Sequence, residues 1–180
     1  MKIKRLILAS AALFAVAATA HAADGTITIN GSIVASTCKI NGGSGNVTVP
    51  LPSLRSTALS SVGAVGGRTP FTLSLTDCTT SDGSPMKVGA YFEPGSSVDL
   101  ASGRLNADTG ADAATGVQIN LLNDQQQQIK VGSAGNQNSQ LVDIGTDGKA
   151  TLNYFAEYYA SDAVTAGAVN SRVQYSLTYQ

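Results

Sequence analysis

The stretch Phe71-Thr72-Leu73-Ser74-Leu75-Thr76 alternates apolar and polar side chains and leads up to Cys78. Successive side chains of a β-strand point to opposite faces, so this alternation predicts a strand with one buried face and one exposed face. The same period of two recurs in four further stretches rich in β-branched and aromatic residues, which we also expect to be strands. They are residues 88–92, 117–121, 152–158 and 173–179.

Short turn signals separate these stretches, and many short strands joined by turns predict an all-β sandwich. No linker divides the chain, which predicts a single domain. Only residues 54–62 are expected to form a short helix or a loop, and the four glutamines at 125–128 are expected in a polar turn or edge. The turn signals are Asn41-Gly42-Gly43-Ser44-Gly45, Gly66-Gly67, Ser81-Asp82-Gly83-Ser84-Pro85, Glu93-Pro94-Gly95 and Asp147-Gly148.

The first 22 residues resemble a secretory leader. Positive charges at residues 2–5 precede an apolar run at 6–18, which ends in the small-residue site Ala20-His21-Ala22. The run is shorter than the approximately 20 residues that span a bilayer. A membrane anchor or a buried helix is the alternative, but the flanks favour cleavage. We therefore expect residues 1–22 to be a signal peptide and the protein to be exported.

Charge gives no sign of nucleic-acid binding. Without the leader, 8 Lys and Arg stand against 12 Asp and Glu, so the net charge is 8 − 12 = −4. No basic patch is visible, and we expect no nucleic-acid partner.

The sequence also argues against an enzyme. The single histidine, His21, lies in the leader, which excludes histidine-based triads and histidine-ligated metals from the exported chain. Residues 143–148 are similar to a calcium loop but lack its spacing and closing glutamate. Glu93 and Glu157 are the only glutamates, and Glu157 is expected to be an ordinary surface charge. We expect no catalytic residue, no metal and no cofactor.

Two cysteines, Cys38 and Cys78, remain after cleavage. An exported chain with two cysteines most simply forms one disulfide. Two free thiols or a metal pair are the alternatives, although this spacing matches no zinc motif.

Residues 24–33 form a second alternating segment, with Ile27, Ile29, Gly31 and Ile33 on one face. The segment is either the first strand of its own sandwich or a strand that adds to another molecule. In the second case the glycine lies where two backbones approach closely.

The alternation at the other end of the chain continues to the penultimate residue, through Val173, Tyr175, Leu177 and Tyr179. Chain ends usually fray unless something holds them. Either a neighbouring strand of the same sheet or a partner chain is expected to hold this one.

Together these features resemble the chaperone–usher pilins. The start of the exported chain is similar to the N-terminal extension of minor adaptor subunits of type 1 pili, with Gly31 at the position of the family's glycine. Cys38 and Cys78 match the two cysteines of the family's first strands, and residues 116–123 resemble its middle strand. Gly167, the fourteenth residue from the C-terminus, and the penultimate Tyr179 match the family's C-terminal motif.

The resemblance implies an incomplete immunoglobulin-like sandwich that lacks its last strand. It divides the chain into a signal peptide (1–22), a donor-strand extension (23–35) and a pilin domain (36–180), with a Cys38–Cys78 disulfide. Ile27, Ile29, Gly31 and Ile33 would fill the groove of a neighbouring pilin. The strand beside the groove, which a periplasmic chaperone would meet first, would contain Gly167, Val173, Tyr175, Leu177 and Tyr179.

The implied function is that of a structural subunit of a fimbrium that supports cell adhesion. It would pass through the periplasm and an outer-membrane usher and polymerise by donor-strand exchange. The resemblance leaves open whether it is the major shaft subunit or a minor adaptor, and it disfavours a two-domain tip adhesin or a chain terminator. The alternative is a self-contained secreted immunoglobulin-like module that binds a sugar or a protein.

Overall fold

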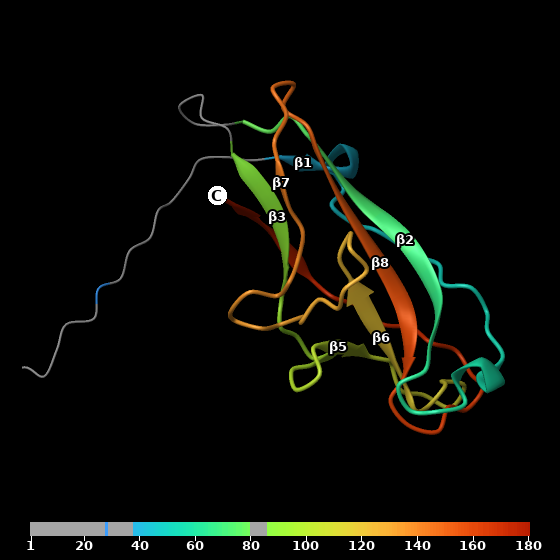
Figure 1. Ribbon diagram of the computed structural model, residues 1–180. Helices are drawn as coiled ribbons and strands as arrows, with labels where there is room; N and C mark the ends of the chain where they lie inside the picture. Colours follow the sequence, from blue (N-terminus) through green and yellow to red (C-terminus); the bar gives the residue numbers. More distant parts are fainter. Residues whose placement is uncertain (1–27, 29–37, 80–85) are drawn as a thin grey trace, which may run out of the picture. The chain divides into compact units, whose positions relative to one another are not determined.

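A computed structural model of the protein describes residue 28 and residues 38–79 and 86–180. From Cys38 onward these residues belong to one compact unit, Val34–Gln180. They form two antiparallel sheets and two short 3₁₀ helices (Figure 1). The elements are β1 (Lys39–Ile40), η1 (Asn41–Gly43), η2 (Ser56–Leu59), β2 (Val65–Thr76), β3 (Lys87–Phe92), β4 (Val98–Asp99), β5 (Arg104–Asn106), β6 (Val117–Leu122), β7 (Leu141–Asp143), β8 (Ala150–Ala160) and β9 (Tyr175–Tyr179).

The larger sheet has the strand order β1-β2-β8-β6-β5-β4, and the smaller sheet has the order β7-β3-β9. The long pair β2 and β8 forms the centre of the larger sheet, with Leu73 opposite Leu152. In the smaller sheet β3 lies between two partners, with Ala90 opposite Leu177. The all-β architecture predicted from the alternating stretches is confirmed.

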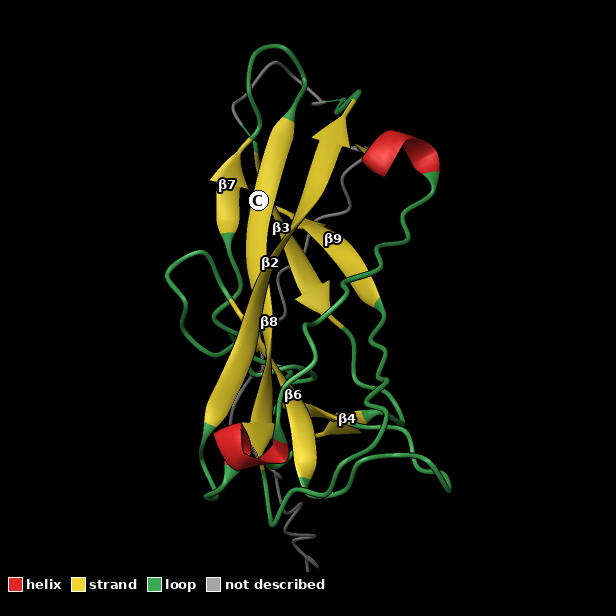
Figure 2. Cartoon of the chain, turned by 90° about the vertical axis from the view of Figure 1, so that its right-hand side faces the viewer, coloured by secondary structure: helices red, strands yellow, loops and turns green. Residues whose placement is uncertain are grey.

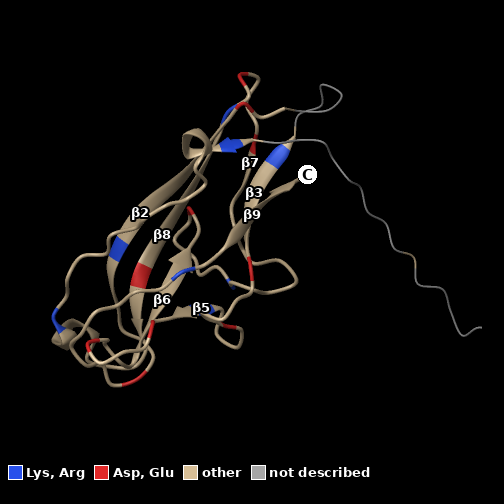
Figure 3. Ribbon diagram, turned by 180° about the vertical axis from the view of Figure 1, so that it is seen from behind, with Lys and Arg blue, Asp and Glu red and all other residues tan. Residues whose placement is uncertain are grey.

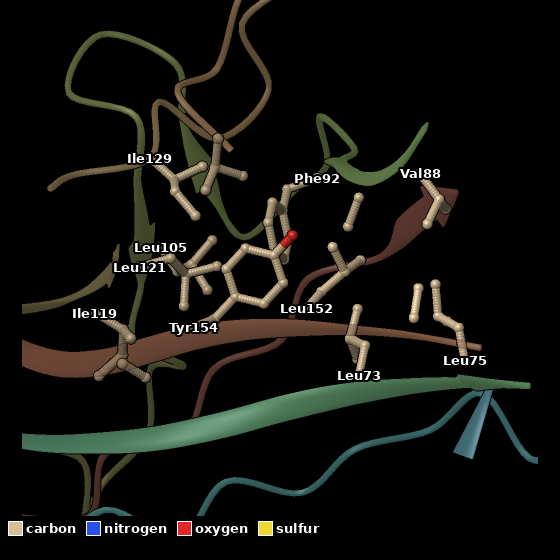
Figure 4. Close-up of a cluster of buried hydrophobic side chains, with 14 of the residues drawn as sticks. Leu73, Leu75, Val88, Phe92, Leu105, Ile119, Leu121, Ile129, Leu152 and Tyr154 are labelled. Atoms are coloured by element: carbon tan, nitrogen blue, oxygen red, sulfur yellow. The ribbon is translucent and has the colours of Figure 1, made fainter. Parts of the chain in front are cut away.

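The core lies between the two sheets. Leu73, Leu152 and Tyr154 are almost completely buried. The Tyr154 ring extends from β8 and meets the ring of Phe92, on β3, edge-to-face at 5.3 Å between centroids (Figure 4). Such a pair adds to the apolar burial that holds the two sheets together.

Gly66 and Gly67 do not form the predicted turn. They lie within β2, at an irregularity that shifts the pairing with β8 between Gly66 and Thr69. Gly67 has φ +67°, and a Cβ there would come within 2.9 Å of the Tyr158 ring. Glycine at this point therefore serves a β-bulge rather than a chain reversal.

The other predicted elements are found close to their expected places. The helix expected within 54–62 is η2, residues 93–95 and 147–148 lie in loops, and the glutamine run lies in and after a turn. The C-terminal strand begins at Tyr175, two residues later than predicted. The predicted turn at 81–85 and the leader at 1–22 lie outside the described residues. Within the described part of the chain, no helix is long and apolar enough to cross a membrane.

Candidate functional site

Residues 45–51, which follow η1, run in an extended path without joining either sheet. Among the described residues, the backbone of 46–51 makes no hydrogen bond to another backbone group. Val47 is 37% exposed in spite of its apolar side chain. Backbone groups near a core normally find partners, so this segment is a strand-like wall that lacks its neighbour.

The C-terminal segment forms the facing wall. From Val169 to Tyr179 every second side chain is half-buried, and none is fully buried. β9 pairs with β3 on one side and is the last strand of its sheet on the other. Among the described residues, one edge of β9 thus has no neighbouring strand.

A groove of about 720 Å³ lies between these two walls. In Figure 2 the first wall runs downward from η1, and the loop part of the facing wall runs downward from β9 on the same side of the molecule. Core side chains from both sheets form the floor of the groove: Leu73, Phe92, Leu105, Ile119, Leu121 and Ala156. Here the hydrophobic core opens to the surface, which is the geometry of a sandwich that lacks one strand.

Two tyrosine hydroxyls close the groove towards the C-terminus. Tyr175 donates a hydrogen bond to the carbonyl of Gly45 at 2.6 Å, and Tyr179 accepts one from the N–H of Cys38 at 3.1 Å. Burial raises the pKa of both tyrosines, so their hydroxyls stay protonated at neutral pH. We call Tyr175 and Tyr179 the tyrosine clasp.

The Cys38–Cys78 disulfide is confirmed, with the two sulfurs bonded at 2.09 Å. It fixes the start of the domain to the end of β2, next to the clasp. An ion pair between Lys39 and Asp77 at 2.8 Å lies beside it, and both side chains are exposed. The disulfide therefore fixes Cys38, which the Tyr179 hydroxyl contacts, to the end of β2.

The predicted groove-bordering residues fall in three places. Val173 and Tyr175 line the groove, whereas Leu177 and Tyr179 lie beyond it, in the part that the clasp closes. Gly167 is exposed and lies outside the groove lining. A Cβ on Gly167 would come within 2.3 Å of the backbone nitrogen of Ala114, so glycine is needed for a close backbone approach.

The predicted donor residues Ile27, Ile29, Gly31 and Ile33 lie outside the described residues. Sequence reasoning missed the wall at 45–51. Its signal was the alternation of Val47, Val49 and Leu51, although Pro50 between them lacks a backbone N–H and argues against a strand.

Glu157 is not the surface charge that the sequence predicted. It is 2% exposed and forms an ion pair with Arg68 at 2.7 Å. The β2 bulge brings Arg68 against it, a contact between residues 89 positions apart that strand alternation does not reveal. Within the described part of the chain, no three His, Cys, Asp or Glu side chains are grouped to hold a metal ion.

Comparison with known proteins gives consistent matches. The chain is 47% identical to the major fimbrial subunit SMF-1 of Stenotrophomonas maltophilia, over 89% of this chain and 95% of that protein. It is 42% identical to the F17 fimbrial protein of Escherichia coli, over 87% of this chain and 88% of that protein.

Among solved structures, a chaperone–usher pilus subunit matches with a TM-score of 0.58 and 25% identity, over 88% of this chain and 96% of that one. The P pilus rod subunit PapA shares the fold with a TM-score of 0.60 at 23% identity, over 79% of this chain and 99% of that one. The model of the type-1 fimbrial protein family matches residues 51–180. The resemblance stated from the sequence is confirmed, and the chain belongs to the family of type-1 fimbrial proteins.

Proposed function

We propose that this protein is the shaft subunit of a surface fibre and that its groove receives an extended segment of a neighbouring subunit. The observation that carries the proposal is the open groove, with two walls that lack a common neighbour and a floor of core side chains. A strand entering there would pair with β9 and with residues 46–51, and its alternate side chains would complete the core. The role is structural, and no catalytic role is proposed.

The occupant is the N-terminal extension of the next subunit, residues 23–35. Its apolar face carries Ile27, Ile29 and Ile33, and burying three isoleucines contributes about 5–9 kcal/mol at 1.5–3 kcal/mol each. Gly31 would allow the backbone to pass close to the groove floor. Burial of the apolar face would therefore drive the strand into the groove.

An empty groove would also explain why the subunit needs a chaperone and an usher during export. Core side chains and an open strand edge favour aggregation unless they are covered. After cleavage of residues 1–22, a periplasmic chaperone would cover the groove until an outer-membrane usher replaces it with the next subunit. The pilin domain, residues 36–180, would then be displayed in a fimbrium on the cell surface and support adhesion.

The relatives favour the shaft over the adaptor role. The relative at 47% identity is a major fimbrial subunit. Shaft subunits contact further copies of themselves. The neighbour expected at the groove is therefore a second copy of this chain.

The test is to fuse residues 24–33 after Gln180 through a flexible linker, in a chain that lacks the original copy. Thermal unfolding is compared with that of the deletion alone. A large rise in melting temperature is expected, and a control fusion with Ile29→Asn and Ile33→Asn should lose most of it. A deletion that is already stable and unaffected by the fusion would instead mean a self-contained binding module.

A further inference from the structure

The outer face of the larger sheet carries a polar belt, which we define as Arg68, Arg104, Asn120, Glu157 and Tyr159. Inward-facing residues of β8 such as Tyr154 and Ala156 belong to the core, so Glu157 and Tyr159 face outward. In Figure 3 the only basic residue of β2 and the only acidic residue of β8 lie next to each other. The belt thus lies on the opposite side of the sheet from the groove.

Glu157 joins three strands. Arg68, on β2, donates from Nε at 2.8 Å to one carboxylate oxygen, and Asn120, on β6, donates from Nδ2 at 3.0 Å to the other. Asn120 is 6% exposed and Glu157 is 2% exposed. A buried carboxylate is costly unless it is paired in this way, so the two donors fix its position.

Arg104 connects a fourth strand, β5, to the contacts around Glu157. Its guanidinium, from β5, stacks 3.6 Å above the Tyr159 ring of β8. The turn after β6 holds both arginines, since Gln126 accepts a hydrogen bond from Arg68 and Gln128 accepts one from Arg104 at 3.2 Å. The belt therefore links β2, β8, β6 and β5 across the sheet.

The belt residues alternate with the residues that line the groove. Ala156 and Tyr158 flank Glu157 in β8. Ile119 and Leu121 flank Asn120 in β6, and Leu105 follows Arg104 in β5. All five of these neighbours line the groove. The strands β5, β6 and β8 are thus held from behind, next to the side chains that line the groove.

We propose that the polar belt positions the groove floor and keeps it ready for strand entry. This inference rests on the proposed function. The floor side chains are the ones that an incoming strand must contact, so the positions of the floor strands decide how well that strand fits. If the belt already fixes the groove floor, the floor loses no further conformational freedom when the incoming strand binds. The affinity of the groove for that strand is therefore higher.

The test uses a labelled synthetic peptide of residues 24–33 and the full chain without its leader, kept dilute so that copies do not bind one another. Glu157→Gln removes the charge that Arg68 and Asn120 hold, and roughly tenfold weaker peptide binding is expected. The control is Asp143→Asn, which breaks the cross-strand ion pair with Lys87 on the smaller sheet. That variant should bind the peptide like the parent chain.

A merely structural role would leave the affinity unchanged, because it would destabilise the empty and filled forms equally. Unchanged peptide affinity in a folded Glu157→Gln variant would therefore overturn the inference. If Glu157→Gln does not fold, Gln126→Ala decides instead, because it keeps the ion pair and loosens only the turn that holds Arg68. A parent chain that does not bind the peptide at all would contradict the proposed function, which separates the two failures.

Discussion

β8 and β9 have similar patterns and different surroundings. In β8 the inward side chains Leu152 and Tyr154 are completely buried, whereas in β9 the inward side chains of Tyr175 and Leu177 are only half-buried. β8 lies between β2 and β6, but among the described residues β9 has only β3 beside it. Alternation therefore specifies which face of a strand turns inward, and neighbours decide how completely that face is covered. For β9 the proposed second neighbour is the entering strand of the next subunit.

The largest effect is expected from removing the disulfide next to the clasp. Replacing Cys38 and Cys78 by serine opens a loop with a sequence separation of 40, a loss of about 4 kcal/mol of stability by loop-closure entropy. Chemical denaturation of the variant and of the parent chain measures this. Since the disulfide fixes Cys38 where Tyr179 of β9 contacts it, a peptide of residues 24–33 that binds beside β9 should restore part of the loss. Equal stability of the two chains would show that other contacts hold the start of the domain.

The two strands can be compared directly by matched truncations. Leu152→Ala should cost about 2–5 kcal/mol, the range for a fully buried leucine, whether or not the groove is filled. Leu177→Ala should cost clearly less, because the Leu177 side chain is only half-buried. Denaturation curves of both variants without the peptide test this. A cost for Leu177→Ala that is as large as that for Leu152→Ala would mean that the inward face of β9 is already covered.

A smaller effect is expected at the start of the C-terminal segment. Gly167→Ala places a Cβ within 2.3 Å of the Ala114 backbone nitrogen, and forcing the two segments apart should cost about 1–3 kcal/mol. Gly110→Ala is the control, because a Cβ there meets nothing within 4 Å. The melting temperatures of the two variants are compared, and similar values would rule out the close approach as the reason for the glycine.

The smallest effect is expected from the clasp itself. Tyr175→Phe removes the hydrogen bond to Gly45 and should cost about 1 kcal/mol in the empty chain. The control is Tyr91→Phe, which removes a hydrogen bond to the Ser133 carbonyl away from the groove. Only Tyr175→Phe should accelerate uptake of the peptide in stopped-flow fluorescence, because the clasp joins walls that the entering strand must separate. Identical uptake rates in the two variants would show that the clasp does not limit strand entry.

The long strands could be predicted because their alternation is local. β2, β3, β6, β8 and β9 each carry it in five or more consecutive residues. β4 and β5, with two and three residues, depend on their neighbours for definition and carry no such signal. The glycine pair at 66–67 misled the prediction because a bulge and a turn both use left-handed backbone.

The site could be predicted only in part. Alternation placed Val173 and Tyr175 on an inward face, but the facing wall was missed because Pro50, within its alternating residues, argues against a strand. The burial of Glu157 depends on Arg68, which lies far away in sequence. The absence of a strand leaves no mark in a sequence, and the expectation of a groove came from the family resemblance.

The missing strand is best tested by amide hydrogen exchange of the dilute full chain without its leader, with and without the peptide of residues 24–33. We expect residues 46–51 and one edge of β9 to exchange rapidly in the empty chain and to become protected when the peptide binds. Protection in β8 should remain unchanged. Strong protection of 46–51 before the peptide is added, or no gain when it is bound, would contradict the claim that one strand is missing there.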